Sequence, residues 1–233
     1  MSVLVPIALV SAIIAIHEAA HALTSYAFGI KPESIHIGLP FKPKKEFITK
    51  GGMPVTISFW LIGGGIVLDN DKLESLSFIK KTAIFVAGPM MNLFAGIVTA
   101  SAFYGIGIGT RLAREIVSAS TESVKQLTTG DVPAKDIVGP VGVVDYGAEL
   151  VQTDPIIGPM LFWLVINFMM GIFNLIPIPG LDGGRIVMGA VTSLSGNSKR
   201  VINITRAITT VFLLVLILGM ITVTIKDLYN LFR

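Results

Sequence analysis

Four long stretches with almost no charged residues constrain this chain more than any other feature of its sequence. The predicted spans are residues 3–28, 82–108, 155–181 and 207–225. Each is long enough for a helix that crosses a hydrocarbon layer of roughly 30 Å. We therefore predict an α-helical polytopic membrane protein with about four main transmembrane helices. We therefore expect the lipid bilayer to be one of its partners.

Composition supports this class. Hydrophobic residues make up 52% of the chain and charged residues only 14%, against about 25% charged in soluble domains. The mean hydropathy is +0.77. Because there is no cysteine, any metal must be held by nitrogen and oxygen atoms. The net charge of +3 does not indicate nucleic-acid binding, since the lysines cluster beside apolar stretches, where they act as topology signals.

The first apolar stretch contains a metal-binding pattern, His17-Glu18-Ala19-Ala20-His21. On a helix the two histidines, four residues apart, leave the same face and can bind one zinc ion. In such H-E-x-x-H patterns the glutamate takes a proton from the water that the metal activates. We predict His17 and His21 as metal ligands and Glu18 as the general base.

A chance occurrence of these three residues is the alternative. Chance is a weaker explanation inside an apolar helix than on a soluble surface helix, because an ionisable cluster in the membrane is costly unless it is functional. A cleaved signal peptide is the alternative for the whole stretch. No basic residue precedes it, and cleavage would remove the pattern, so we expect an uncleaved helix.

Residues 31–76 differ from their surroundings and predict strands. The segments 34–39, 46–49 and 54–68 are rich in β-branched and aromatic residues and are separated by proline and glycine. We expect a small membrane-associated sheet with a Gly-rich part at Gly63, Gly64 and Gly65. That part is either an ordinary turn or a strand edge that could pair with an extended peptide. His36 is a third-ligand candidate, although a plain surface histidine is favoured.

Four features lie between the second and third spans or within them. Gly88-Pro89 predicts close helix packing, and Asn92 is a polar residue that seeks a partner in the membrane interior. Residues 110–136 have soluble composition and predict an amphipathic helix or a loop on the membrane surface. The run from Gly139 to Gly142 predicts a turn or a re-entrant element.

Asp182 is the candidate third ligand. It closes the third span after the run Asn174-Leu175-Ile176-Pro177-Ile178-Pro179-Gly180-Leu181, and it is the sole acidic residue between Asp154 and Asp227. Zinc bound by two histidines takes a third protein ligand and leaves one position open. The alternative is an N-cap of the next helix. We favour the ligand, because a cap does not explain the proline-rich approach.

The basic residues test this hypothesis independently. Twelve of the 18 lie in the first and third loops, and six lie on the other side. This distribution predicts cytosolic first and third loops and both termini outside. His17, His21 and Asp182 then fall on the cytosolic side together.

Taken together, these motifs resemble the site-2 protease family of intramembrane zinc metalloproteases. The pairing of His17-Glu18-x-x-His21 with Asn174-x-x-Pro177-x-Pro179-x-Leu181-Asp182-Gly183 carries the likeness. The order Ile37-Gly38, Gly63-Gly64, Gly88-Pro89-x-x-Asn92 and Gly139-Pro140-Val141-Gly142 is similar to the bacterial branch that contains the regulator-of-sigma-E protease.

The resemblance implies a single intramembrane protease domain over residues 1–233 with one zinc ion. It implies that His17, His21 and Asp182 bind the metal and that Glu18 is catalytic. Asn174 would bind the unwound substrate backbone, and Asn92 would lie near the catalytic core. The strand at Gly63 to Gly65 would offer an edge to the substrate, and the segment around Gly38 would dip into the membrane.

The expected function is cleavage of transmembrane protein substrates near the cytosolic side of a prokaryotic cell membrane. Members of that branch usually carry PDZ domains between the second and third spans, where this chain has only residues 110–136, so its substrate selection differs. A polytopic metal transporter and a silent scaffold that binds membrane helices are the alternatives. The intact Glu18 argues against the scaffold. The sequence does not fix an oligomeric state.

Overall fold

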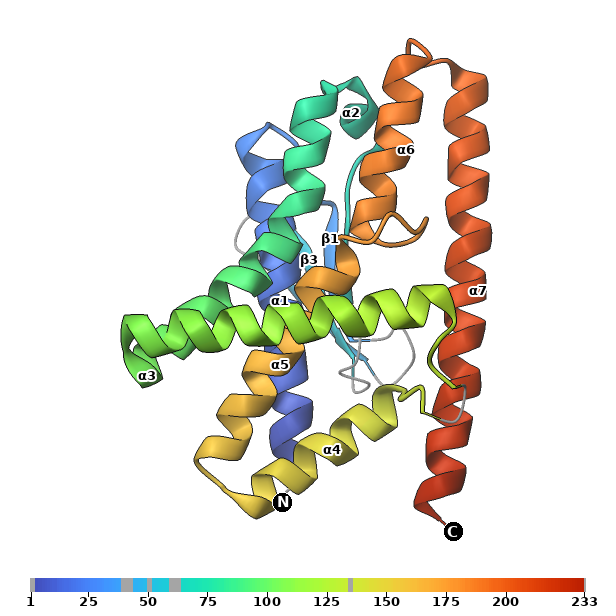
Figure 1. Ribbon diagram of the computed structural model, residues 1–233. Coiled ribbons are helices and arrows are strands. Elements are labelled where there is room, and N and C mark those ends of the chain that lie inside the picture. Colours follow the sequence, from blue (N-terminus) through green and yellow to red (C-terminus); the bar gives the residue numbers. More distant parts are fainter. Residues whose placement is uncertain (1–2, 39–43, 50–51, 59–63, 134–135, 233) are drawn as a thin grey trace.

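The computed structural model describes residues 3–38, 44–49, 52–58, 64–133 and 136–232. The chain forms helices joined by short connections, with one small sheet inserted after the first helix (Figure 1). The helices are α1 (Leu4–Ala27), α2 (Asn70–Ser75), α3 (Phe78–Thr129), α4 (Pro140–Thr153), α5 (Ile157–Asn174), α6 (Asp182–Leu194) and α7 (Lys199–Leu231).

Four of these helices, α1, α3, α5 and α7, are long and apolar enough to cross a membrane. This confirms the predicted fold class. α1 and α5 lie within the predicted spans, whereas α3 and α7 extend beyond them, most clearly α3. Gly105, with φ 76° and ψ 156°, turns the chain inside α3, so its second arm crosses in front of the other helices (Figure 1). Residues 110–129, predicted as a surface helix or loop, are helical.

The sheet has the strand order β2-β3-β1-β4. Its strands are β1 (Ser34–Ile37), β2 (Lys44–Ile48), β3 (Pro54–Ser58) and β4 (Gly64–Val67). β1 pairs in parallel with β3 and antiparallel with β4. The predicted segment 54–68 therefore holds two strands, and β4 forms one edge of the sheet. β4 also packs against α1.

Small residues let α3 pack closely on α5 and α1. A Cβ on Gly96 would lie 2.8 Å from Cζ of Phe168, and one on Gly171 would lie 3.0 Å from the carbonyl oxygen of Pro89. Membrane helices lack a hydrophobic driving force between them, so they associate through such close contacts. The buried residues Ile84, Phe162 and Phe168 complete this packed region.

The run from Gly139 to Gly142, predicted as a turn or re-entrant element, is the start of α4. Pro140 occupies the first turn of the helix, where its missing N–H costs nothing. Oδ2 of Asp227, on α7, accepts hydrogen bonds from the backbone N–H groups of Gly139 and Gly142, both at 2.9 Å. A carboxylate from the last helix thus caps α4, where the helix dipole favours negative charge.

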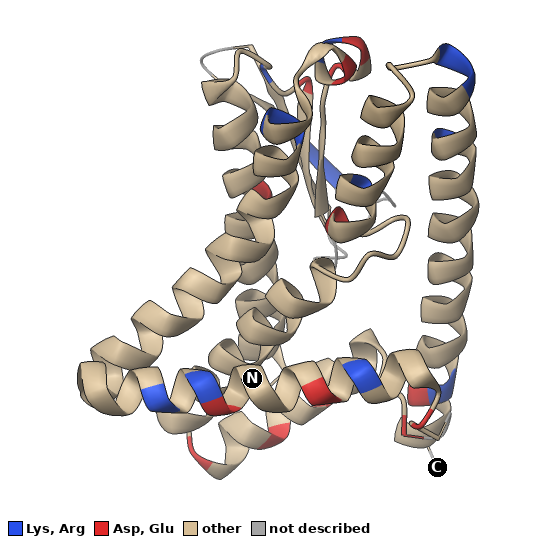
Figure 2. Cartoon of the chain, turned by 45° about the horizontal axis from the view of Figure 1, so that its top comes forward, with Lys and Arg blue, Asp and Glu red and all other residues tan. Residues whose placement is uncertain are grey.

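Charged residues gather mainly at two ends of the molecule (Figure 2). One group lies on the second arm of α3 and the end of α7, and the other on α2 and the start of α7. Both termini lie at the same end (Figure 1), as expected for an even number of membrane crossings. Which end faces the cytosol stays a prediction.

Candidate metal centre

Two imidazoles on α1 and one carboxylate on α6 meet at a single point. Nε2 of His17 lies 3.1 Å from Nε2 of His21. Oδ2 of Asp182 lies 3.1 Å from the first of these nitrogens and 3.2 Å from the second. The three side chains are almost fully buried, with 3%, 5% and 7% of each residue exposed. Asp182 therefore shares one site with two histidines that lie 165 and 161 positions before it in the sequence.

The turn before α6 explains how Asp182 reaches the histidines. Asp182 is the first residue of α6, and the N-cap is Leu181, which makes no side-chain cap. The geometry therefore does not support the alternative role of Asp182 as an N-cap. Gly183 and Gly184 let the proline-rich segment fold back on the helix start. A Cβ on Gly184 would lie only 2.0 Å from the carbonyl oxygen of Ile178.

Charge keeps the Asp182 carboxyl ready to bind a cation. Burial raises its pKa, but contacts with His17 and His21 and the nearby charge of Arg185 outweigh burial, so the pKa of Asp182 lies well below its usual range. The group is therefore a carboxylate at neutral pH.

The geometry and the donor set fit a zinc ion. Atoms held about 2.0–2.2 Å from zinc at tetrahedral angles lie about 3.3–3.6 Å apart, close to the separations found here. Nδ1 of His21 donates to the carbonyl oxygen of Ile84 at 2.7 Å, which directs the lone pair of Nε2 toward the site. Among the described residues no further histidine or carboxylate joins these three as a fourth ligand. One position is thus left for water or substrate.

Gly88 forms the floor of this site. A Cβ on Gly88 would lie 2.3 Å from Nε2 of His21 and 2.7 Å from Nε2 of His17. Any side chain there would occupy the space between the two nitrogens. Only glycine leaves room for an ion at this place on α3.

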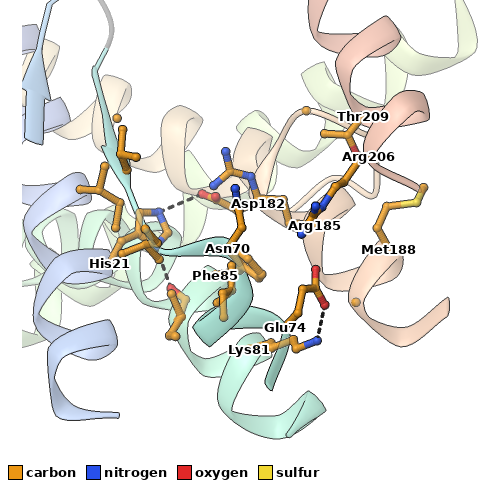
Figure 3. A pocket seen from close by; sticks show the side chains of 18 of the residues that line it. His21, Asn70, Glu74, Lys81, Phe85, Asp182, Arg185, Met188, Arg206 and Thr209 are labelled. Carbon is orange, nitrogen blue, oxygen red and sulfur yellow. Dashed lines mark hydrogen bonds and ion pairs between the residues drawn. The ribbon is translucent and has the colours of Figure 1, made fainter. Parts of the chain in front are cut away.

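The site opens into a pocket of about 610 Å³. Glu18 lines it beside the histidines, and Asn174 lines it from the end of α5. β4, α2, α3, α6 and α7 supply the remaining walls, and Figure 3 shows the labelled side chains facing the hollow. A Cβ on Gly64 would lie 3.4 Å from Cγ of Glu18, so the strand edge approaches the glutamate directly.

Comparison with known proteins identifies the family. The sequence profile of Peptidase family M50 matches residues 5–217. This chain belongs to peptidase family M50. The likeness to site-2 proteases predicted from the motifs is thereby confirmed.

Several relatives of this chain carry protease names. Zinc metalloprotease RasP of Bacillus licheniformis is 28% identical over 176 residues, which cover 72% of this chain and 40% of that protein. Regulator of sigma-W protease RasP of Bacillus subtilis is 30% identical over 129 residues, 54% of this chain and 30% of that protein. Regulator of sigma-E protease RseP of Salmonella typhimurium is 32% identical over 108 residues, 46% of this chain and 24% of that protein. The matches thus cover less than half the length of these relatives.

The remaining predicted site residues of this M50 chain fall in different places. His36 lies on β1, where its Nε2 is 3.0 Å from the hydroxyl of Ser34, outside the metal cluster. Asn92 is fully buried on α3, one turn beyond Gly88, and is not among the residues that line the pocket. Gly38 is buried at the end of β1. Gly65 lines the pocket on β4 with Gly64, whereas Gly63 lies outside the described residues.

Sequence reasoning missed three contributions to the M50 site. Gly88 was expected only to pack helices, yet it borders the imidazoles. Ile84 orients His21 through a backbone carbonyl, which no side-chain pattern reveals. Arg185 was counted as a topology signal, yet it lines the pocket one turn after Asp182. The short spacing from Asp182 to Arg185 was the only available signal for the last of these.

Proposed function

We propose that this chain is a zinc-dependent intramembrane endopeptidase that hydrolyses peptide bonds of membrane-spanning substrates near the cytosolic side. The observation that carries the proposal is the convergence of His17, His21 and Asp182. Their ligand atoms all lie within 4.8 Å of one another, inside a pocket that Glu18 also lines. Family membership adds independent support.

In this proposal His17, His21 and Asp182 hold one zinc ion. When bound, zinc would lower the pKa of a water molecule to about 7 and polarise the scissile carbonyl group. Glu18 would take a proton from the attacking water and pass it to the leaving nitrogen as the carbon–nitrogen bond breaks. The water oxygen would become part of the new carboxyl group, so the reaction yields one carboxyl and one amine end.

The substrate segment would be extended where it is cleaved. A helical peptide bond is hydrogen-bonded and shielded, so it must unwind before water can attack it. β4 is an edge strand that lines the pocket through Gly64 and Gly65, and an edge can pair with an extended peptide through backbone hydrogen bonds. We propose that this edge and Asn174 hold the substrate backbone. Asn92, being fully buried, would act through neighbouring helices rather than by direct contact.

The test uses the purified chain in detergent with a labelled single-span substrate. We expect cleavage that is lost on zinc chelation and restored by adding zinc. We expect Glu18→Gln to lower kcat by about 10²- to 10⁴-fold, the range for loss of a general base, while bound zinc stays at one ion per chain. Glu115→Gln, on the exposed second arm of α3, removes a glutamate far from the pocket and is the matched control.

The outcomes separate the alternatives. Cleavage that persists in Glu18→Gln at the level of the control would overturn the mechanism. Zinc flux into sealed vesicles without cleavage would indicate a transporter. Substrate binding without cleavage in the zinc-loaded chain would indicate a scaffold.

The membrane orientation is a second part of the proposal. We propose that both termini are outside and that the pocket faces the cytosol of a prokaryotic cell. Because the chain has no cysteine, single cysteines introduced at Lys72 and Asp131 can be labelled in intact cells with an impermeant maleimide. We expect labelling at position 131 and not at position 72, and the reverse pattern would invert the topology.

A further inference from the structure

Arg185 occupies an unusual position in the pocket. It lies on α6, one turn after Asp182, and lines the same hollow as Glu18 and the metal cluster (Figure 3). Its guanidinium carbon lies 5.6 Å from the centre of the Phe85 ring, near enough for a cation–π contact. Phe85 follows Ile84, whose carbonyl oxygen accepts the hydrogen bond from His21. One turn of α3 therefore supports both a metal ligand and this cation.

Among the described residues the guanidinium forms no direct ion pair, although its charge acts on the nearby Asp182 carboxylate. Lys81, in the same pocket, shows the contrast, because it is buried and pairs with Glu74 at 2.6 Å. Asp182 directs Oδ2 at the two histidines instead. Arg185 is an exposed residue that lines the pocket, and its guanidinium carries five N–H donors and keeps its charge. The five donors are available to a group that enters with the substrate.

We infer that Arg185 is a further catalytic residue that donates hydrogen bonds to the carbonyl oxygen of the scissile peptide bond. This inference rests on the proposed peptidase function. Glu18 reaches the pocket on the side of β4, near Gly64, whereas Arg185 reaches it from α6 on the side of Phe85. A peptide lying between them would meet a base on one side and a cation on the other.

The chemistry favours the carbonyl oxygen over other acceptors. Attack by water places negative charge on that oxygen next to the metal ligands, and donors already fixed there stabilise the transition state more than the substrate. Proton transfer remains with Glu18, and Arg185 supplies only hydrogen bonds and charge.

Arg206 offers a matched comparison. It lines the same pocket but comes from α7 (Figure 3). Removing it takes the same charge from the hollow at a different place. If only the net charge of the pocket mattered, the two arginines would be equivalent.

The experiment compares Arg185→Gln, Arg185→Lys, Arg206→Gln and Arg200→Gln with the wild type. Arg200 is exposed at the start of α7 and does not line the pocket. For each purified variant, bound zinc, kcat and KM are measured with the single-span substrate. The dissociation constant of a phosphinic peptide is measured as well, because its phosphinate carries the charge of the transition state.

We expect Arg185→Gln to lower kcat by about 10²- to 10³-fold, as for loss of an oxyanion donor, with KM changed by less than about threefold. Zinc content should be unchanged, and the phosphinic peptide should bind at least about 30-fold more weakly. Arg185→Lys should restore part of both losses. Arg206→Gln should lower kcat by less than about tenfold, and Arg200→Gln should match the wild type.

Three results would overturn the inference. These are a kcat for Arg185→Gln within threefold of wild type, a loss of bound zinc in that variant, or an equal loss of kcat in Arg206→Gln. Each presupposes a wild type that cleaves. A zinc-loaded wild type without cleavage would instead contradict the proposed function itself.

Discussion

Two walls of the pocket are built in different ways. The metal wall consists of α1, α3, α5 and the start of α6, and the opposite wall is α7. In α1, α3 and α5, 39% of the most apolar window is buried, whereas none of that window is buried in α7. The first wall is a packed core, and the second is a helix whose apolar surface faces outward on nearly all sides, as lipid contact requires.

The contacts of α7 are confined to a few points. Among its described residues only Thr205 and Asp227 are buried. The first lines the pocket, and the second caps α4. Lys226 adds a hydrogen bond to the carbonyl oxygen of Ile137. The metal wall is therefore fixed by close packing, whereas few side chains of α7 are buried and its end makes polar contacts with the start of α4.

This difference suits the proposed reaction. Metal ligands must stay within a few tenths of an ångström of their positions, and packed cores resist displacement. A substrate helix must enter the pocket from the lipid, which is easier beside a helix with few contacts. Changes in the metal wall should therefore have large effects on zinc binding, and changes around α7 smaller effects that spare it.

Gly88→Ala should have the largest effect. The added methyl group would lie 2.3 Å from Nε2 of His21, within the space that an ion needs. We expect bound zinc below about one tenth of the wild-type content, because close packing prevents relaxation, and no measurable cleavage. Metal analysis and the cleavage assay measure both. Gly107→Ala, on the same helix with open space around it, should keep zinc and activity. Full zinc content in Gly88→Ala would show that the metal wall is more pliable than we infer.

Gly184→Ala should have the next largest effect. Its new Cβ would lie 2.0 Å from the carbonyl oxygen of Ile178, so the start of α6 must shift and carry Asp182 with it. We expect zinc affinity to fall by about 10- to 100-fold, as when a ligand loses its support. Competition with a zinc-binding dye measures the affinity. Gly189→Ala, on the same helix with its nearest neighbour at 4.0 Å, should bind zinc normally, and equal affinities in the two variants would contradict the prediction.

The sequence predicted the metal wall in outline but not its fine structure. The spacing of His17, Glu18 and His21 predicts a metal site. The isolation of Asp182 among apolar residues predicts the third ligand. Both signals arise because charge in a membrane segment is rare. The four spans follow from hydropathy alone.

The rest depends on contacts that leave no local mark. Gly88 looks like the packing glycines found throughout membrane helices, so its place beside the imidazoles is visible only in the fold. Gly105 likewise gives no sign that it turns α3. In the sequence Arg185 is one more basic residue after an apolar segment, and such residues usually set topology. Asp227 lies near the end of the chain, and its partners on α4 are 85 and 88 residues away.

Asp227→Ala tests the α7 wall. The substitution leaves two backbone N–H groups at the start of α4 without their acceptor, which costs about 1–3 kcal/mol and should lower the Tm by several degrees. We expect faster hydrogen exchange at Gly139 and Gly142 and unchanged zinc affinity. Thermal unfolding, exchange and dye competition measure the three quantities. Glu149→Ala, an exposed position on α4, is the control. A loss of zinc in Asp227→Ala would mean that the two walls are not independent.

The smallest predicted effect concerns the joint between α4 and α5, where the capped helix meets the metal wall. Asp154 accepts hydrogen bonds from the backbone N–H groups of Ile157 at 2.8 Å and Ile156 at 2.9 Å. The bond from Ile157, and to a lesser extent the bond from Ile156, holds the pKa of Asp154 below its usual range. Its contribution to stability is therefore complete above the unfolded pKa of about 3.9 and is lost as the pH falls through the lower folded pKa.

We expect the exchange protection of the Ile156 and Ile157 amides, corrected for intrinsic rates, to be constant from pH 6 to about pH 4 and to fall at lower pH, through the folded pKa. In Asp154→Asn the protection should be weaker at pH 6 and should lose this pH step, because the amide does not titrate. Zinc affinity at pH 7 should match the wild type in this variant, since the joint lies outside the metal cluster. Protection in the wild type that stays constant down to about pH 1, below the folded pKa, would mean that this carboxylate does not hold the joint.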